Sequence, residues 1–195
     1  MDFGAALGGF GTTDLLLVLY FLAFFVLGFA QGTIRRLIGI ASILFSFLLA
    51  ANLREPLGNF LAQNWTQFPP EYAIMVGFLA VFLAAAVAFS LFIQTFYRKV
   101  QLFEKYTVVD EILGGLLGVV QGVLILGAFI IILDSFFQIP GIRPVNTELP
   151  LLREFHNAYN SSGTAALYRE TLVPSFLAVT GFLVPDALRQ FFPRA

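Results

Sequence analysis

Four long stretches of the chain contain no charged residue, and this feature restricts the possible folds more than any other. They run over Leu15–Ile34, Leu37–Leu53, Tyr72–Tyr97 and Ile112–Leu133. An α-helix needs about 17 to 25 apolar residues to cross roughly 30 Å of hydrocarbon, so each stretch approaches or exceeds spanning length. Hydrophobic residues make up 58% of the chain and charged residues 12%, about half the charged share of a typical soluble domain. The composition therefore indicates a membrane protein.

The same stretches predict helices rather than strands. The strands of a transmembrane β-barrel alternate apolar and polar residues, and these stretches do not. In lipid every backbone N–H and C=O group has to be paired within the segment, which an α-helix achieves alone. A soluble helical core would need wide polar faces, which are also missing. We predict an all-α integral membrane protein with four transmembrane helices.

The chain changes character after the fourth stretch. We therefore divide it into a four-helix transmembrane domain, residues 1–136, and a tail, residues 137–195, that begins with a connector rich in proline and glycine. The spacing of apolar residues predicts an amphipathic helix from about Glu148 to Tyr159, with Thr147 as its cap. The tail is expected to be extracytoplasmic or interfacial.

A further apolar segment in the tail, residues 172–185, is short and is interrupted by Pro174 and Gly181. It is predicted to lie on the membrane surface or to pack on the helical core, and a fifth span remains an alternative. Between the second and third stretches, we predict a loop over Arg54–Glu71 in which Trp65 anchors the chain at the membrane interface.

The positive charges predict the orientation. Arg35 and Arg36 follow the first stretch, and three more cations follow the third, whereas the intervening loop contributes Arg54. Under the positive-inside rule, this bias puts both termini outside the cytoplasm. Arg35 and Arg36 are thus predicted to set topology, and binding of lipid phosphate or of an acidic partner is the alternative.

Glycines recur at every fourth position in the last stretch, at Gly114, Gly118 and Gly122. Small residues at this spacing form a flat strip on which another helix can pack closely in lipid. Gly28 and Gly32 form a shorter strip in the first stretch and are a candidate facing surface. The spacing alone does not separate packing within one chain from packing between chains, so a homo-oligomer and an envelope protein partner both remain open.

Two polar positions accompany the strip. Gln121 lies near the middle of the last stretch, where an amide in hydrocarbon must face another helix or water, so it is predicted either to join helices or to line a polar pathway. Asp110 precedes the stretch and is predicted to cap its helix, where a carboxylate also interacts favourably with the helix dipole. A catalytic role for Asp110 with Glu111 is a weaker alternative.

Residues suited to catalysis or metal binding are scarce. The chain has no cysteine, and its single histidine, His156, is predicted to be solvated on a surface helix. No HExxH, GxSxG or Walker-type motif occurs. We therefore expect no enzyme activity, no cofactor and no metal site, and we expect the lipid bilayer rather than nucleic acid to be the surrounding partner.

Two motifs in the chain resemble those of a known protein family. Gly32 with Arg35, and the series from Asp110 through the three glycines to Asp134, are similar in order and spacing to the colicin V production protein (CvpA) family of bacterial inner-membrane proteins. The resemblance covers roughly residues 14–136. Gln121 and Gln31 stand where the family pattern has basic residues. The resemblance implies a role in producing or exporting the peptide toxin colicin V and, more generally, in envelope function.

Two functional hypotheses follow. In the first, the protein is a noncatalytic scaffold or accessory factor whose glycine strip docks another helix. In the second, it is a small oligomeric channel or transporter, for which Gln121 and Gln94 are the motivating residues. Ion-coupled transport usually requires ionisable groups inside the membrane. Because Asp14, Asp110 and Asp134 lie at the ends of the apolar stretches, the first hypothesis is favoured.

Overall fold

The computed structural model describes residues 12–96, 107–137, 149–161, 170 and 174. The part of the chain it describes forms five helices, which are α2 (Thr12–Gln31), α3 (Thr33–Asn64), α4 (Pro70–Phe96), α5 (Thr107–Phe137) and α6 (Pro150–Asn160). The first four are long and apolar enough to cross a membrane. The prediction of an all-α membrane protein with four transmembrane helices is confirmed.

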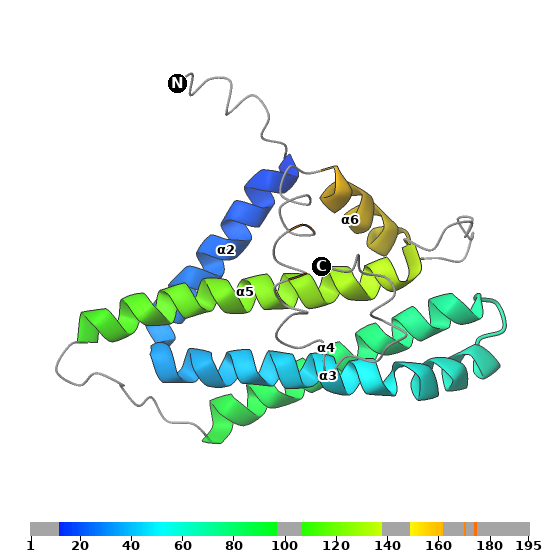
Figure 1. Cartoon of the computed structure of the whole chain (residues 1–195), viewed down its shortest axis with the longest axis horizontal. Coiled ribbons are helices and arrows are strands. Elements are labelled where there is room, and N and C mark those ends of the chain that lie inside the picture. The colour runs from blue at the N-terminus through cyan, green and yellow to red at the C-terminus, as the bar shows by residue number, and fades with distance from the viewer. Residues whose placement is uncertain (1–11, 97–106, 138–148, 162–169, 171–173, 175–195) are drawn as a thin grey trace.

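Helix α5 is the centre of the arrangement, because it contacts each of the other four helices. In Figure 1, α3, α4 and α5 lie along the long axis of the molecule, while α2 diverges from α3 and crosses α5. The α2–α3 junction and the start of α5 share one end of the bundle. The α3–α4 turn, the end of α5 and α6 lie toward the other end.

A single glycine separates α2 from α3. Gly32 has a φ of 79°, in the left-handed region that side chains other than glycine rarely adopt. A Cβ atom there would also lie 2.7 Å from Oδ2 of Asp110, so any side chain would collide with α5. This residue turns the chain sharply, and α2 therefore packs on α5 instead of folding back along α3.

The contact between α2 and α5 is a contact of backbones. A Cβ atom on Gly114 would lie 2.6 Å from the carbonyl oxygen of Gly28, and one on Gly118 would overlap the carbonyl oxygen of Phe24. At the next turn, the hydroxyl of Tyr20 donates a hydrogen bond of 2.9 Å to the carbonyl of Gly122. The order of these contacts makes the two helices antiparallel. The glycine strip is therefore filled by a helix of the same chain.

Helices α3 and α4 form a second antiparallel pair. The predicted loop over Arg54–Glu71 is too long, because α3 extends into it. The chain stays helical through Arg54 and Pro56 as far as Asn64, so the turn is confined to the residues before Pro70. A Cβ atom on Gly58 would lie 2.5 Å from the Cα of Ile74, which shows how closely the extension packs on α4. This packing stabilises helix beyond a proline that interrupts one backbone hydrogen bond.

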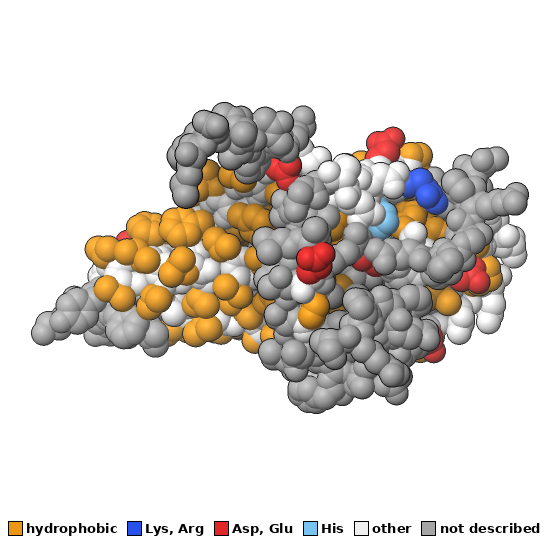
Figure 2. All heavy atoms as spheres, turned by 45° about the horizontal axis from the view of Figure 1, so that its top comes forward, with side chains coloured by type: hydrophobic (Ala, Val, Ile, Leu, Met, Phe, Trp, Pro, Cys, Tyr) orange, Lys and Arg blue, Asp and Glu red, His pale blue; other side chains and the backbone are white. Residues whose placement is uncertain are grey.

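Aromatic side chains pack in the core between α3 and α4. Phe47 of α3 contacts Phe78 and Phe82 of α4, with ring centroids 5.7 Å and 6.5 Å apart. Large apolar side chains on the outer faces of the helices are exposed instead, as expected where lipid surrounds the protein. Figure 2 shows one such apolar face over the end of the molecule opposite α6.

The start of the tail is close to prediction. α6 spans Pro150–Asn160, against a predicted helix from about Glu148 to Tyr159. The proposed cap Thr147, the segment 172–185 and both termini lie outside the described residues.

We predict that Gly118→Ala weakens the α2–α5 contact. The new methyl group would overlap the carbonyl of Phe24, and the helices can accept it only by separating, at a cost of about 1 to 3 kcal/mol. Thermal unfolding of the purified protein in detergent should show a lower midpoint. Val120→Leu, at an exposed position of the same helix, should leave the midpoint unchanged. Equal midpoints for the two variants would contradict the proposed contact.

Candidate functional site: a polar cavity at the α2–α3 junction

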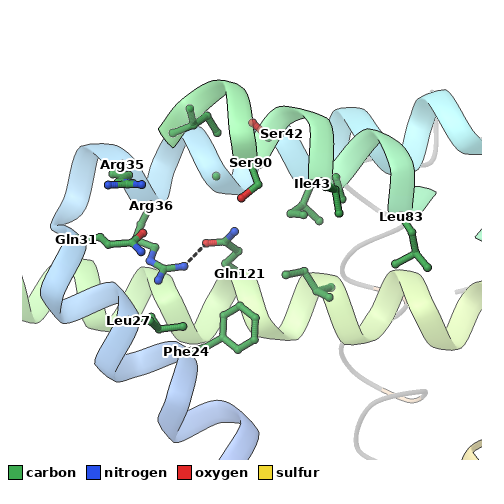
Figure 3. Close-up of a pocket in the computed structure, with 15 residues that line it drawn as sticks. Phe24, Leu27, Gln31, Arg35, Arg36, Ser42, Ile43, Leu83, Ser90 and Gln121 are labelled. Carbon is green, nitrogen blue, oxygen red and sulfur yellow. Dashed lines mark hydrogen bonds between the residues drawn. The ribbon is translucent and has the colours of Figure 1, made fainter. Parts of the chain in front are cut away.

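A polar contact inside the bundle joins Arg36 to Gln121. Arg36 comes from the first turn of α3 and is only 5% exposed, and Gln121 comes from the middle of α5. Nη1 of Arg36 donates a hydrogen bond of 2.6 Å to Oε1 of Gln121, and the two side chains point toward one another in Figure 3. This places Gln121 against another helix, one of the two predicted environments, and its partner is a cation.

Glycine again makes the contact possible. A Cβ atom on Gly39, one turn after Arg36, would lie 3.0 Å from Nε2 of Gln121. The amide thus lies across a bare patch of the α3 backbone. No sequence motif includes Gly39, although its position three residues after Arg36 is a usable signal.

The charge of Arg36 is not neutralised by the described residues. Its Nε atom is buried and has no hydrogen-bond partner, and neither of the described salt bridges includes Arg36 or Arg35. A buried cation is costly unless it is paired and fully hydrogen-bonded. The Arg36 side chain points into the protein, so the predicted alternative in which it binds lipid phosphate would require the phosphate to enter the bundle.

The pair opens onto a cavity of about 390 Å³ between the four long helices. Figure 3 shows Gln31 and Arg35 beside Arg36, with Ile43 and Leu83 on the far side of Gln121. The described residues that line the cavity are Phe24, Leu27, Gln31, Arg35, Arg36, Gly39, Ser42, Ile43, Leu83, Ala86, Val87, Ser90, Ile93, Gln121 and Ile125. The cavity is therefore mixed, with its cations near the α2–α3 junction, and the described part of its wall has no carboxylate.

Asp110 lies on the other side of that junction. Because α5 begins at Thr107, Asp110 lies within the first turn, and its predicted role as the cap residue is wrong. The side chain is 1% exposed and lies against Gly32, and Oδ1 has no hydrogen-bond partner. The hydroxyl of Thr33 donates a hydrogen bond of 2.9 Å to the carbonyl oxygen of Asp110. Asp110 therefore belongs to the joint between α2, α3 and α5.

A second cavity, of about 410 Å³, lies toward the other end of the bundle. Its wall is almost entirely apolar and includes α6, which contributes Phe155, Ala158 and Tyr159. Leu83 of α4 and Ile125 of α5 line both cavities, so the two spaces adjoin at these side chains.

His156 attaches α6 to the bundle. Its Nε2 atom lies 2.9 Å from Oδ1 of Asp134, at the end of α5, and both residues are buried. Its ring also packs on Phe137, with ring centroids 5.1 Å apart. The predicted solvated surface position is wrong, because α6 turns the face that carries His156 and Tyr159 toward the core. Asp134 and His156 are 22 positions apart, so sequence spacing gave no signal for this pair.

The described residues contain no group of three or more His, Asp or Glu side chains that could hold a metal ion. The polar cavity is suited to binding an anion. Its described charged groups, Arg35 and Arg36, remain protonated and cannot act as bases.

These features define the class of protein and agree with the comparisons to known proteins. With four long apolar helices around a small polar cavity, the chain is a multi-pass membrane protein. The family model described as "Colicin V production protein" matches residues 13–157, so the chain belongs to that family. The predicted resemblance is confirmed, and the match extends past residue 136 into α6. No curated protein and no solved structure matches the chain.

We predict that Gln121→Leu destabilises the fold by about 2 kcal/mol, since a hydrogen bond to a charged group is lost while the charge stays buried. Arg36→Met combined with Gln121→Leu should cost less than the sum of the two single changes. Thermal unfolding in detergent measures all three. Gln31→Leu is the matched control, because that amide lines the same cavity without a hydrogen bond to Arg36. Strict additivity would show that Arg36 and Gln121 do not interact.

We also predict that His156→Ala loosens α6 from the bundle. Loss of the contact with Asp134 should raise amide hydrogen exchange over residues 150–160 by about tenfold, equivalent to about 1.4 kcal/mol, without affecting α5. Asn157→Ala changes an exposed neighbour on the same helix and should leave the exchange rates as they are. An unchanged exchange profile in His156→Ala would mean that α6 is held by other contacts.

Proposed function

We propose that this protein is a noncatalytic accessory factor of the bacterial inner membrane that supports the production or export of a colicin V-type toxin. The observation that carries the proposal is the family match over residues 13–157. The geometry supports the noncatalytic part, because the charged side chains of the polar cavity bind anions and do not transfer protons.

The mode of action that the geometry supports differs from docking through the glycine strip. Gly114 and Gly118 are in contact with α2, so a second protein could use them only by displacing that helix. Within the described part of the chain, the polar cavity between the helices is a place where the protein can recognise a ligand. In the same proposal, Arg35 and Arg36 lie at the cytoplasmic side, and the turn between α3 and α4 lies outside.

A channel through one copy of the chain has less support. Beyond Ser42, the space between α3, α4 and α5 is closed by apolar side chains, of which Phe47, Phe82 and Ile130 are almost completely buried. A continuous polar path would need further polar groups along this core. An oligomeric channel formed between copies is the remaining version of that hypothesis.

The test is complementation in a bacterial strain that lacks its own family member and carries a colicin V system. The wild-type chain should restore secreted toxin, measured as growth inhibition of a sensitive strain. Arg36→Met should lower the toxin titre at least tenfold at an equal amount of membrane-inserted protein. Leu116→Ala, at an exposed position on α5, is the control and should retain the full titre.

Two results would contradict the proposal. Failure of an inserted, folded wild-type chain to restore toxin would remove the role in toxin production. Full activity of Arg36→Met would remove the cavity from the mode of action while leaving that role in place.

A further inference from the structure

The two cavities lie next to each other, and the two ends of this pair of cavities differ in polarity. At one end lie Arg35, Arg36 and Gln121, and at the other end lie side chains that are almost all apolar, including Leu17, Phe129 and Phe155. The ends adjoin at Leu83 and Ile125. A pair of adjoining cavities that is cationic at one end and hydrocarbon-like at the other matches a molecule with a negatively charged head and a hydrocarbon chain.

The cationic end has unused binding capacity. Nε of Arg36 is buried without a hydrogen-bond partner, although Nη1 of the same guanidinium is bonded to Gln121. Arg35 adds a second positive charge to the wall of the cavity, and the described residues of that wall include no carboxylate. A fixed guanidinium with free donors is suited to a phosphate group, because its planar fork matches phosphate oxygens.

We propose that the joined cavities bind a lipid that carries a terminal phosphate. The phosphate lies against Arg36 and Arg35, and the hydrocarbon chain passes Leu83 and Ile125 into the apolar cavity beneath α6. This ligand neutralises the buried charge and at the same time covers the apolar wall. Free phosphate would satisfy only the first requirement, and an uncharged lipid only the second. The inference rests on the proposed function, in which the same cavity is a binding site.

The shape of each part agrees with this assignment. Volumes of about 390 Å³ and 410 Å³ lie within the usual range of small-molecule sites, roughly 300 to 1,000 Å³. Basic pockets between transmembrane helices are a recurrent means of holding anionic lipid head groups. The Gln121 amide fixes the guanidinium in place, so that the cation does not have to be ordered again when the head group binds.

The experiment is native mass spectrometry of the purified full-length chain, released from detergent micelles after titration with three probes. Farnesyl phosphate carries both head and tail, inorganic phosphate only the head, and farnesol only the tail. We expect farnesyl phosphate to bind at least tenfold more tightly than either of the other two. Equal affinities for farnesyl phosphate and inorganic phosphate would overturn the lipid assignment, and equal affinities for farnesyl phosphate and farnesol would overturn the anion site.

Variants locate the bound molecule. Arg36→Met should weaken farnesyl phosphate binding at least tenfold, whereas Arg153→Met, which removes one positive charge from α6 outside the polar cavity, should change it less than twofold. Ala86→Trp fills the polar cavity with both arginines intact and should also weaken binding tenfold. If Arg36→Met does not fold, Ala86→Trp decides: unchanged affinity in that variant overturns the proposal.

The experiments can contradict the lipid assignment without contradicting the role in toxin production, and the reverse is also true. A chain that restores toxin secretion but binds none of the probes leaves the proposed function in place and overturns this inference. A chain that binds farnesyl phosphate through Arg36 but restores no toxin supports the lipid site and contradicts the role in toxin production.

Discussion

The close approach of α2 and α5 is the contact on which the rest of the bundle depends. In lipid, apolar side chains gain little by touching each other rather than hydrocarbon, so helices associate through dense packing. Gly28, Gly114 and Gly118 allow backbone atoms to meet, which larger residues would prevent. Each glycine costs about 1 kcal/mol in helix propensity. That cost is offset by packing between helices, and Gly32 makes the packing possible because its positive φ directs α2 away from α3.

The position of the polar cavity follows from the same contact. Gln121 directly precedes Gly122 in α5, so it lies on the helix face next to the one that α2 covers. α3 occupies that neighbouring face, and Gly39 brings its backbone close enough for Arg36 to reach the amide. The cavity is therefore located where α2 has turned away from α3 and the three helices meet. A larger residue at Gly39 would push the amide of Gln121 from its position.

The sequence is informative about the elements and less so about their partners. Length and lack of charge identified the four spans, since the bilayer imposes both requirements on any crossing helix. The spacing of Gly114 and Gly118 identified the packing face. It did not identify α2 as the occupant, because a second chain would need the same spacing. The pairs Arg36–Gln121 and Asp134–His156 join residues far apart in sequence, and only the assembled bundle specifies them. Helix propensity also failed to predict that α3 continues through Pro56, where packing on α4 outweighs the lost backbone hydrogen bond.

The attachment of α6 connects the tail to the membrane part of the protein. His156 anchors this helix at the end of α5, and Tyr72 accepts a hydrogen bond of 2.9 Å from the backbone N–H of Leu149, just before α6. Fixed at both points, α6 forms one wall of the apolar cavity. A change that moves α6 therefore changes the hydrocarbon end of the proposed lipid site without touching Arg36. The cationic end depends instead on the α2–α3 junction, so the two ends of the site are controlled by different contacts. Occupancy of the whole site requires both to be in place.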